Sequence, residues 1–126
     1  MYKLSEVNLV HKSDVYFDVV KPMVNKLLQG GEPQKVLHHG EIYIYLDRIY
    51  LYDTKRWYKA SMGDIQEIKP MISQKQLIIR FRNYDMVLSC DKYSHLLALR
   101  DFLNLSQNYF KENNYMYRGN GSRIMG

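Results

Sequence analysis

The amino-acid sequence predicts an α+β domain, in which a strongly bent antiparallel sheet of about seven short strands is capped by a C-terminal helix. Three observations support this fold class. Between residues 36 and 90, several short segments alternate apolar and polar residues with the period of two that marks half-buried strands. The connections between these segments are too short for the crossovers of a parallel sheet. One long amphipathic helix follows the last strand, an order typical of α+β chains.

The clearest strand pair is the stretch EIYIYLDRIYLYD at residues 41–53, which predicts two strands joined by a tight turn at Asp47-Arg48. Such a turn pairs Tyr45 with Tyr50 and Tyr43 with Tyr52. Asp-Arg is not the preferred Asn-Gly type of turn, so a different register is the alternative. Alternation gives the hairpin an aliphatic face, expected to be core, with Ile42, Ile44, Leu46, Ile49 and Leu51, and a tyrosine face with Tyr43, Tyr45, Tyr50 and Tyr52.

The other elements follow from turn and cap signals along the chain. Gly40 predicts a bulge or a break in the strand that begins near residue 36. Asp91 is a suitable N-cap for a helix at about 92–113. Further strands are expected at 57–62, 65–68, 75–82 and 84–90, and the apolar stripe of the helix consists of Leu96, Leu99, Phe102, Leu103 and Phe110.

The N-terminal part of the chain is the most variable in its pattern. Residues 13–20 are rich in β-branched and aromatic types, and a short helix is expected at about 21–29, with Pro22 in its first turn and Gly30-Gly31 as its stop. The residues after 113 include three glycines and show no periodicity. We therefore divide the chain into an N-terminal segment with a short helix at 1–34, one domain at 35–113 and a flexible tail at 114–126.

The composition is that of a globular protein without covalent cross-links. The 126 residues carry a net charge of +5, which permits a weak attraction to acidic partners or membranes. Cys90 is the single cysteine, so no internal disulfide is possible. No secretory signal and no run of 18 apolar residues is found. These features favour a cytoplasmic location.

No pattern in the chain indicates catalysis. His38 and His39 are adjacent on an expected strand, where neighbouring side chains point to opposite faces, so the pair is a poor metal site. Cys90 lies in an alternating strand, which suggests burial rather than reactivity. No nucleophile, zinc, phosphate-loop or dinucleotide motif is present. We expect a protein that is not an enzyme, without metal, cofactor or nucleic-acid partner.

The tyrosine face is the main candidate for function. Tyrosine tolerates both burial and solvent and is enriched at interfaces, so four rings on one face favour a protein-binding surface. The alternative is internal, with residues 13–29 folded over the face. Residues 55–59, the cluster KRWYK, are the one basic and aromatic motif, suited to phosphate groups or a membrane surface.

The run GEIYIYLDRIYLYDTKRWYKASMGDIQEI, followed by QLIIRF, MVLSC and SHLLALRDFLNL, resembles GRAM and bacterial pleckstrin-homology-like units. Over about residues 35–105 it is most similar to the N-terminal domain of the archaeal taxis adaptors of the CheF family. The resemblance implies a pleckstrin-homology-like fold. It also implies a non-enzymatic adaptor that couples the chemotaxis response regulator to cytoplasmic components of the archaellum motor.

Taken together, the residues and the resemblance predict a cytoplasmic protein-interaction adaptor of archaeal taxis. Its partner-binding residues are expected to be Tyr43, Tyr45, Tyr50, Tyr52, Arg56 and Trp57. The alternative is a peripheral membrane or acidic-lipid-binding module that uses Lys55, Arg56, Trp57 and Lys59. Against this alternative, lipid-binding members of the pleckstrin-homology fold usually carry basic residues in the loop of their first hairpin, and here that loop is expected to be Asp47-Arg48 alone.

Overall fold

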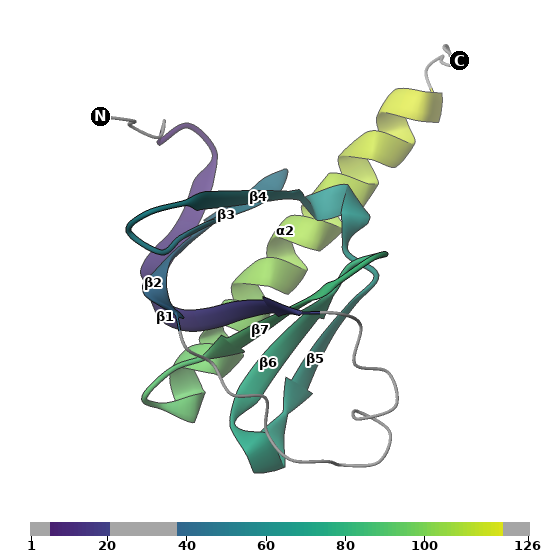
Figure 1. The fold of residues 1–126 in the computed structure, drawn as a ribbon. Helices are drawn as coiled ribbons and strands as arrows, with labels where there is room; N and C mark the ends of the chain where they lie inside the picture. Colours follow the sequence, from purple (N-terminus) through teal and green to yellow (C-terminus); the bar gives the residue numbers. More distant parts are fainter. Residues whose placement is uncertain (1–5, 21–37, 120–126) are drawn as a thin grey trace.

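The structure, a computed structural model, describes residues 6–20 and 38–119, with side chains up to residue 113. It is a seven-stranded antiparallel sheet with one long helix, which confirms the α+β class (Figure 1). The sheet order is β4-β3-β2-β1-β7-β6-β5, and helix α2 runs diagonally across the bent sheet. The strands are β1 (Leu9–Val20), β2 (His38–Tyr45), β3 (Arg48–Tyr52), β4 (Trp57–Ser61), β5 (Glu67–Met71), β6 (Gln76–Arg80) and β7 (Asp85–Ser89).

Strand β1 lies at the centre of the sheet. It pairs with β2 on one side and with β7 on the other, so the sheet begins at Leu9, ahead of the domain boundary expected at residue 35. Residues 13–20 therefore lie within the sheet and do not fold over the tyrosine face. The helix expected at 21–29 lies outside the described residues.

The β2–β3 hairpin differs in register from the prediction. Tyr43 pairs with Tyr50 and Ile44 with Ile49, so the predicted pairing is wrong by two residues. The strands are joined by Leu46-Asp47, one residue earlier than the predicted Asp47-Arg48 turn, because Asp-Arg lacks the glycine that would fix a tight turn there. A shift of two residues leaves the strand residues on their predicted faces, because the side-chain period of a strand is also two. Leu46 is the exception, since it was predicted to be core but lies in the turn and is half-buried.

Gly40 lies within a continuous β2, opposite Val15, so the predicted bulge or break is wrong. A Cβ atom at Gly40 would overlap the carbonyl oxygen of Tyr52 on β3, so glycine is needed for this close approach of two backbones. The register irregularity is in β1 instead, between Leu9 and His11.

The main core lies between the sheet and α2 (Tyr93–Gly119). Leu96, Leu99 and Leu103 are buried, and Phe102 and Phe110 pack against the same core, which confirms the predicted apolar stripe of the helix. Full burial of one such leucine contributes roughly 2 kcal/mol. From the sheet, the core receives alternate residues of each strand, among them Ile42, Ile44, Ile49, Leu51, Leu77, Ile79, Met86 and Leu88.

Two short 3₁₀ turns connect β4, β5 and β6. The first, η1 (Met62–Asp64), joins β4 to β5, and the second, η2 (Ile72–Gln74), joins β5 to β6. Met62 is buried in the main core, so η1 anchors the C-terminal end of β4 to this core. Within residues 6–20 and 38–119, no helix is both long and apolar enough to cross a membrane.

Candidate interaction surface

The sheet face opposite α2 carries the tyrosines of the hairpin and the tryptophan of the next strand. The register places Tyr43 beside Tyr50, Tyr50 beside Lys59, and Tyr52 beside Trp57. Strand alternation directs these side chains away from the main core. The surface is therefore built from three consecutive strands, β2, β3 and β4.

Five aromatic rings on this face contact one another. The indole ring of Trp57 stacks on Tyr52, with ring centres 4.4 Å apart, and lies 5.6 Å from Tyr43 and 6.2 Å from Tyr50. Tyr45 meets Tyr50 edge-on at 5.7 Å. Such offset and edge-on pairs each contribute about 0.5–1.5 kcal/mol beyond the area they bury. We call this group the aromatic face: Tyr43, Tyr45, Tyr50, Tyr52 and Trp57.

The five rings are not equally accessible. Tyr45 is 0% exposed, so it supports the aromatic face from beneath and offers no surface to a partner. Tyr43, Tyr50, Tyr52 and Trp57 are half-buried, each with one part of its ring open to solvent. A binding partner would therefore meet four rings of the five that the sequence predicts.

Two cations lie over the rings. The guanidinium carbon of Arg48 is 4.0 Å from the ring centre of Tyr45 and 5.5 Å from that of Tyr50. Its Nε donates a hydrogen bond of 3.1 Å to the Tyr50 hydroxyl, and its Nη1 contacts a carboxylate oxygen of Asp47 at 2.6 Å. The ammonium of Lys12, from β1, is 5.3 Å from the Tyr43 ring centre. The face thus combines aromatic surface with positive charge.

Neither cation is among the site residues predicted from the sequence. Arg48 has the same strand parity as the tyrosines, so alternation within the hairpin is a signal that could have found it. No local signal could have found Lys12, because its place beside Tyr43 depends on the pairing of β1 with β2.

Tyrosine hydroxyls on the face are held by hydrogen bonds. The hydroxyl of Tyr43 donates to Glu41 over 2.9 Å, and that of Tyr52 donates to the carbonyl oxygen of Thr54 over 3.0 Å. Burial, reinforced by the Glu41 carboxylate, raises the pKa of Tyr43 to about 12. At neutral pH this hydroxyl is therefore protonated, and the orientation of its ring is fixed.

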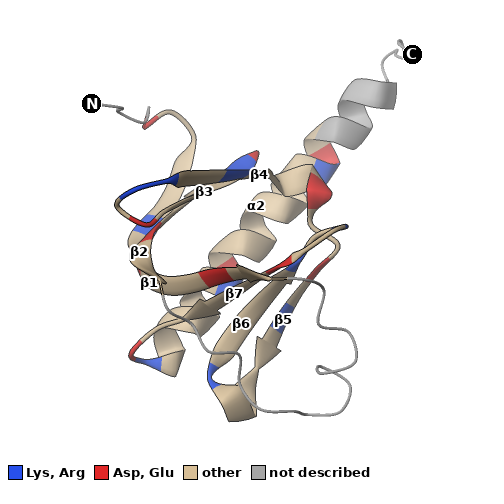
Figure 2. Cartoon of the chain, viewed as in Figure 1, with Lys and Arg blue, Asp and Glu red and all other residues tan. Residues whose placement is uncertain are grey.

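The loop between β3 and β4 presents basic side chains on a tight turn. The carboxylate of Asp53 accepts hydrogen bonds from the backbone amides of Lys55 at 3.0 Å and Arg56 at 2.7 Å, and these bonds lower its pKa. Lys55 and Arg56 are exposed, and Figure 2 shows basic segments along this loop. Arg56 lies 6.0 Å from the ring of Tyr58, which packs against the main core, so the structure does not bring Arg56 onto the aromatic face.

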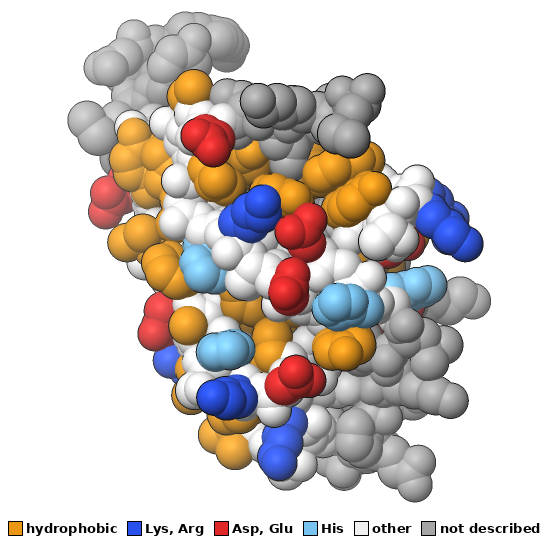
Figure 3. Space-filling model, turned by 90° about the vertical axis from the view of Figure 1, so that its left-hand side faces the viewer, with side chains coloured by type: hydrophobic (Ala, Val, Ile, Leu, Met, Phe, Trp, Pro, Cys, Tyr) orange, Lys and Arg blue, Asp and Glu red, His pale blue; other side chains and the backbone are white. Residues whose placement is uncertain are grey.

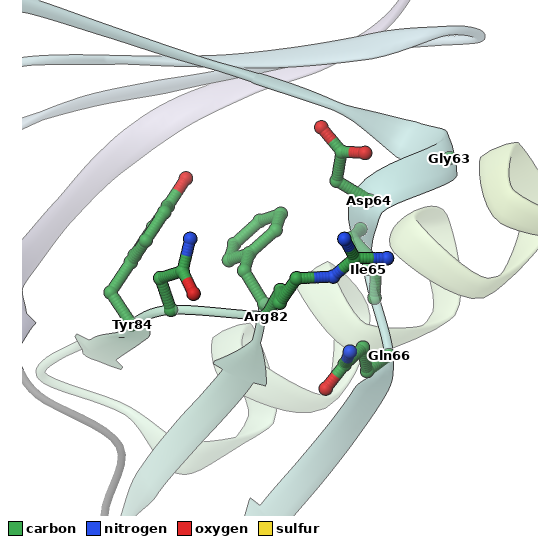
Figure 4. Close-up of a pocket in the computed structure, with 8 residues that line it drawn as sticks. Gly63, Asp64, Ile65, Gln66, Arg82 and Tyr84 are labelled. Carbon is green, nitrogen blue, oxygen red and sulfur yellow. The ribbon is translucent and has the colours of Figure 1, made fainter.

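A hollow of about 460 Å³ lies between η1 and the β6–β7 turn (Figure 4). Its aromatic part is Phe81 stacked on Tyr84, with ring centres 4.8 Å apart. Burial and the nearby Asp64 carboxylate raise the pKa of Tyr84. Asp64 and Arg82 are exposed at the rim, and no nucleophile with an adjacent base lies among the lining residues: Gly63, Asp64, Ile65, Gln66, Phe81, Arg82, Asn83 and Tyr84.

The histidines do not form a metal site in the described part of the chain. Figure 3 shows histidine side chains scattered among acidic and basic ones on one side of the molecule. No three side chains of His, Cys, Asp or Glu gather within the described residues in a way that could hold a metal ion. His11 stacks on Phe102 of α2 at 4.3 Å, and His39 lies 4.8 Å from Tyr16, so both take part in ring packing.

Cys90 faces a small hollow of about 260 Å³ that His39 and His95 also line. Its sulfur lies 4.0 Å from the carbonyl oxygen of Asp14. Burial, with a smaller contribution from Asp91, raises the pKa of the thiol to about 11. At neutral pH the thiol is therefore protonated and a weak nucleophile.

We expect Cys90 to react slowly with iodoacetamide until the pH rises through about 11. At pH 9 the folded chain should be alkylated about 50-fold more slowly than the chain unfolded in guanidinium, because only about one thiol in a hundred is then a thiolate. The measurement is the alkylation rate by mass spectrometry between pH 7 and 11. Equal rates in the folded and unfolded chain would contradict this prediction.

No protein-family model matches this chain, and no curated protein is similar to it at a significant level. Among solved structures, the chain is similar to a chain of the 8S snRNP assembly intermediate, with a TM-score of 0.63 and 10% sequence identity. The match covers 86% of this chain and 88% of that chain. At this identity the similarity shows that the two chains share a fold.

Proposed function

We propose that this chain is a non-enzymatic protein-interaction adaptor with a pleckstrin-homology-like architecture, and that the aromatic face is its contact surface. The observation that carries the proposal is the packing of Trp57 against three tyrosines, on the sheet face that α2 leaves uncovered. Tyrosine, tryptophan and arginine are the residues most enriched at the energetic centres of protein interfaces.

The aromatic face suits protein binding because it is already ordered. The hydroxyls of Tyr43 and Tyr52 donate to fixed acceptors, and that of Tyr50 accepts from Arg48. Each immobilised side chain would otherwise cost about 0.5–1.5 kcal/mol of conformational entropy on binding. A partner thus meets rings whose orientation changes little.

The pathway proposed is archaeal taxis, on the resemblance of residues 35–105 to the CheF adaptors. In this role the chain is a cytoplasmic coupling protein, and its partners are the chemotaxis response regulator and components of the archaellum motor. The pleckstrin-homology-like architecture accords with a bent seven-stranded antiparallel sheet followed by one C-terminal helix.

We expect Tyr50→Ala to weaken binding to the phosphorylated chemotaxis response regulator about thirtyfold, as removal of a central interface residue does. Tyr50 contacts Tyr45, Trp57 and Arg48, so its loss opens the middle of the aromatic face. Isothermal titration calorimetry gives the affinity. Tyr109→Ala is the matched control, because Tyr109 is also an exposed tyrosine but lies on α2.

Two results would overturn this proposal. One is an unchanged affinity of Tyr50→Ala, with circular dichroism showing that the variant is folded. The other is the absence of binding to the response regulator in both its phosphorylated and unphosphorylated forms, together with no binding to cytoplasmic archaellum motor components.

The second candidate function is binding to an anionic membrane. This function is favoured by three exposed cations that lie close in sequence to Trp57: Lys55, Arg56 and Lys59. The ring of Trp57 is stacked on Tyr52 rather than projecting, which limits its insertion into a bilayer. Sedimentation with anionic vesicles at low and high salt is the test, and the absence of salt-sensitive binding would exclude this candidate.

A further inference from the structure

Within residues 6–20 and 38–119, the sheet has two edge strands, β4 and β5, and they differ in how well they are protected. Strand β5 contains Pro70, which has no N–H group to offer a new strand, and α2 packs against β5. Strand β4, with the sequence WYKAS, contains no proline. An edge without such protection can accept a strand from another chain.

The hydrogen bonds around β4 show which of its backbone groups point outward. The amide of Asp53 donates to the carbonyl oxygen of Arg56, and the amide of Met62 donates to the carbonyl oxygen of Asp47. In an antiparallel ladder, hydrogen-bonded pairs alternate with pairs whose backbone groups point away from each other. The β3–β4 register then makes Ile49–Ala60 a hydrogen-bonded pair and directs the N–H and C=O groups of Lys59 and Ser61 away from β3.

The same two residues carry their side chains on the sheet face that holds the aromatic face. Lys59 lies opposite Tyr50 and is exposed, and Ser61 lies opposite Arg48. A strand added to β4 would therefore extend the surface formed by Tyr50 and Trp57. Its residue opposite Lys59 would point its side chain to the same side as the lysine.

The charges near β4 favour an acidic partner. The exposed cations are Lys59 and, on the loop before the strand, Lys55 and Arg56. Two of the nearby carboxylates have partners: Asp47 contacts Arg48, and Asp53 accepts backbone amides. A third, Asp64, is exposed on η1 beyond the end of the strand. Opposite charges that face each other across two strands stabilise their pairing.

We propose that the partner docks by adding an extended acidic segment to the free edge of β4, with carboxylates placed against Lys59 and the Lys55-Arg56 loop. This inference rests on the proposed interaction function and names its mode of contact. The backbone groups of Lys59 and Ser61 supply the hydrogen bonds, and the lysine and the aromatic face supply the specificity.

The experiment uses the full chain and a capped nine-residue peptide that alternates glutamate with threonine. Amide hydrogen exchange followed by NMR reports on single backbone groups. We expect the amides of Lys59 and Ser61 to exchange about tenfold more slowly at saturating peptide, because the new strand would close them. The matched control peptide has the same sequence with the glutamate amides methylated, because these are the amides that face β4 in an antiparallel addition. The methyl groups keep the charges but prevent strand pairing.

A charge test uses Lys59→Glu, with Lys92→Glu just before α2 as its matched control. We expect Lys59→Glu to weaken peptide binding about tenfold and Lys92→Glu to leave it nearly unchanged. Lys92 is exposed and lies at the opposite end of α2 from Phe110, the residue next to Gly63, and distant exposed charges are screened. A second peptide has glutamine in place of each glutamate. It should bind to the unaltered chain as weakly as the acidic peptide binds to the Lys59→Glu variant.

Three results would overturn the strand-addition inference. The peptide could bind without slower exchange at Lys59 and Ser61, the methylated peptide could bind equally well, or the peptide could fail to bind. The failure of this inference can be told apart from failure of the interaction function. If the two amides stay open while Tyr50→Ala still weakens the response-regulator complex, the aromatic face binds its partner by side chains alone. If the two amides become protected but Tyr50→Ala leaves the affinity for the response regulator unchanged, the β4 edge accepts a strand and the aromatic face is not the contact surface.

Discussion

Replacement of Gly40 by alanine is expected to lower the free energy of unfolding by about 3 kcal/mol, the upper end of the range for overpacking a closed site. The added methyl group would overlap the carbonyl oxygen of Tyr52 and lie 3.0 Å from the Phe17 ring. A backbone carbonyl in a sheet cannot turn away without breaking its ladder. Relief therefore requires β2 and β3 to separate at the open end of their hairpin.

Urea denaturation followed by circular dichroism measures the effect of Gly40→Ala. Gly63→Ala is the matched control, because its methyl group would meet a side chain, with the Phe110 ring 2.7 Å away. An aromatic ring can rotate or shift with its helix, so we expect a loss below about 1 kcal/mol for this control. A Gly40→Ala variant as stable as Gly63→Ala would show that the β2–β3 backbone is more adaptable than the structure indicates.

Removal of the Asp85 carboxylate is expected to destabilise the fold by about 3 kcal/mol, as loss of one partner from a buried ion pair does. Asp85 is 0% exposed and accepts two hydrogen bonds of 3.1 Å from Arg80, one from Nε and one from Nη2. The two residues face each other across β6 and β7. In Asp85→Ala, the Arg80 guanidinium loses this bidentate partner.

A double-mutant cycle compares the free energy of unfolding of Asp85→Ala, Arg80→Ala and the double variant. It separates the interaction energy between the two side chains from the cost of leaving one charge without its partner. Asp101→Ala is the control, since Arg100 contacts Asp101 at 3.0 Å in an exposed pair on α2. We expect a change below about 0.5 kcal/mol for this surface pair. An equally small change in Asp85→Ala would mean that the buried pair contributes little.

The faces of the elements could be predicted from the sequence, but their pairings could not. Alternation places Ile44 in the core and Tyr43 outside it regardless of register, because a shift by two residues preserves both. The register itself depends on the turn, and Asp47-Arg48 carries no residue that dictates a turn type. The central position of β1 depends on contacts with β7 near the other end of the domain, which no local pattern reports.

The candidate site was predictable to a similar extent. The tyrosines of the hairpin and Trp57 follow from strand parity, and the structure brings all five rings together. Sequence reasoning could not anticipate that Tyr45 is fully buried, because burial depends on what surrounds the strand. Arg56 was predicted as a partner-binding residue alongside the tyrosines, whereas the loop geometry set by Asp53 directs Arg56 toward Tyr58 and away from the aromatic face.

The position of β1 between β2 and β7 has a consequence for how the chain folds during translation. Strands β2, β3 and β4 pair with sequence neighbours and can form soon after they leave the ribosome. Strand β1 is synthesised first, yet one of its edges has no partner until β7 emerges near the end of the domain. During that interval the unpaired edge of β1 can pair with a wrong strand of this or another nascent chain.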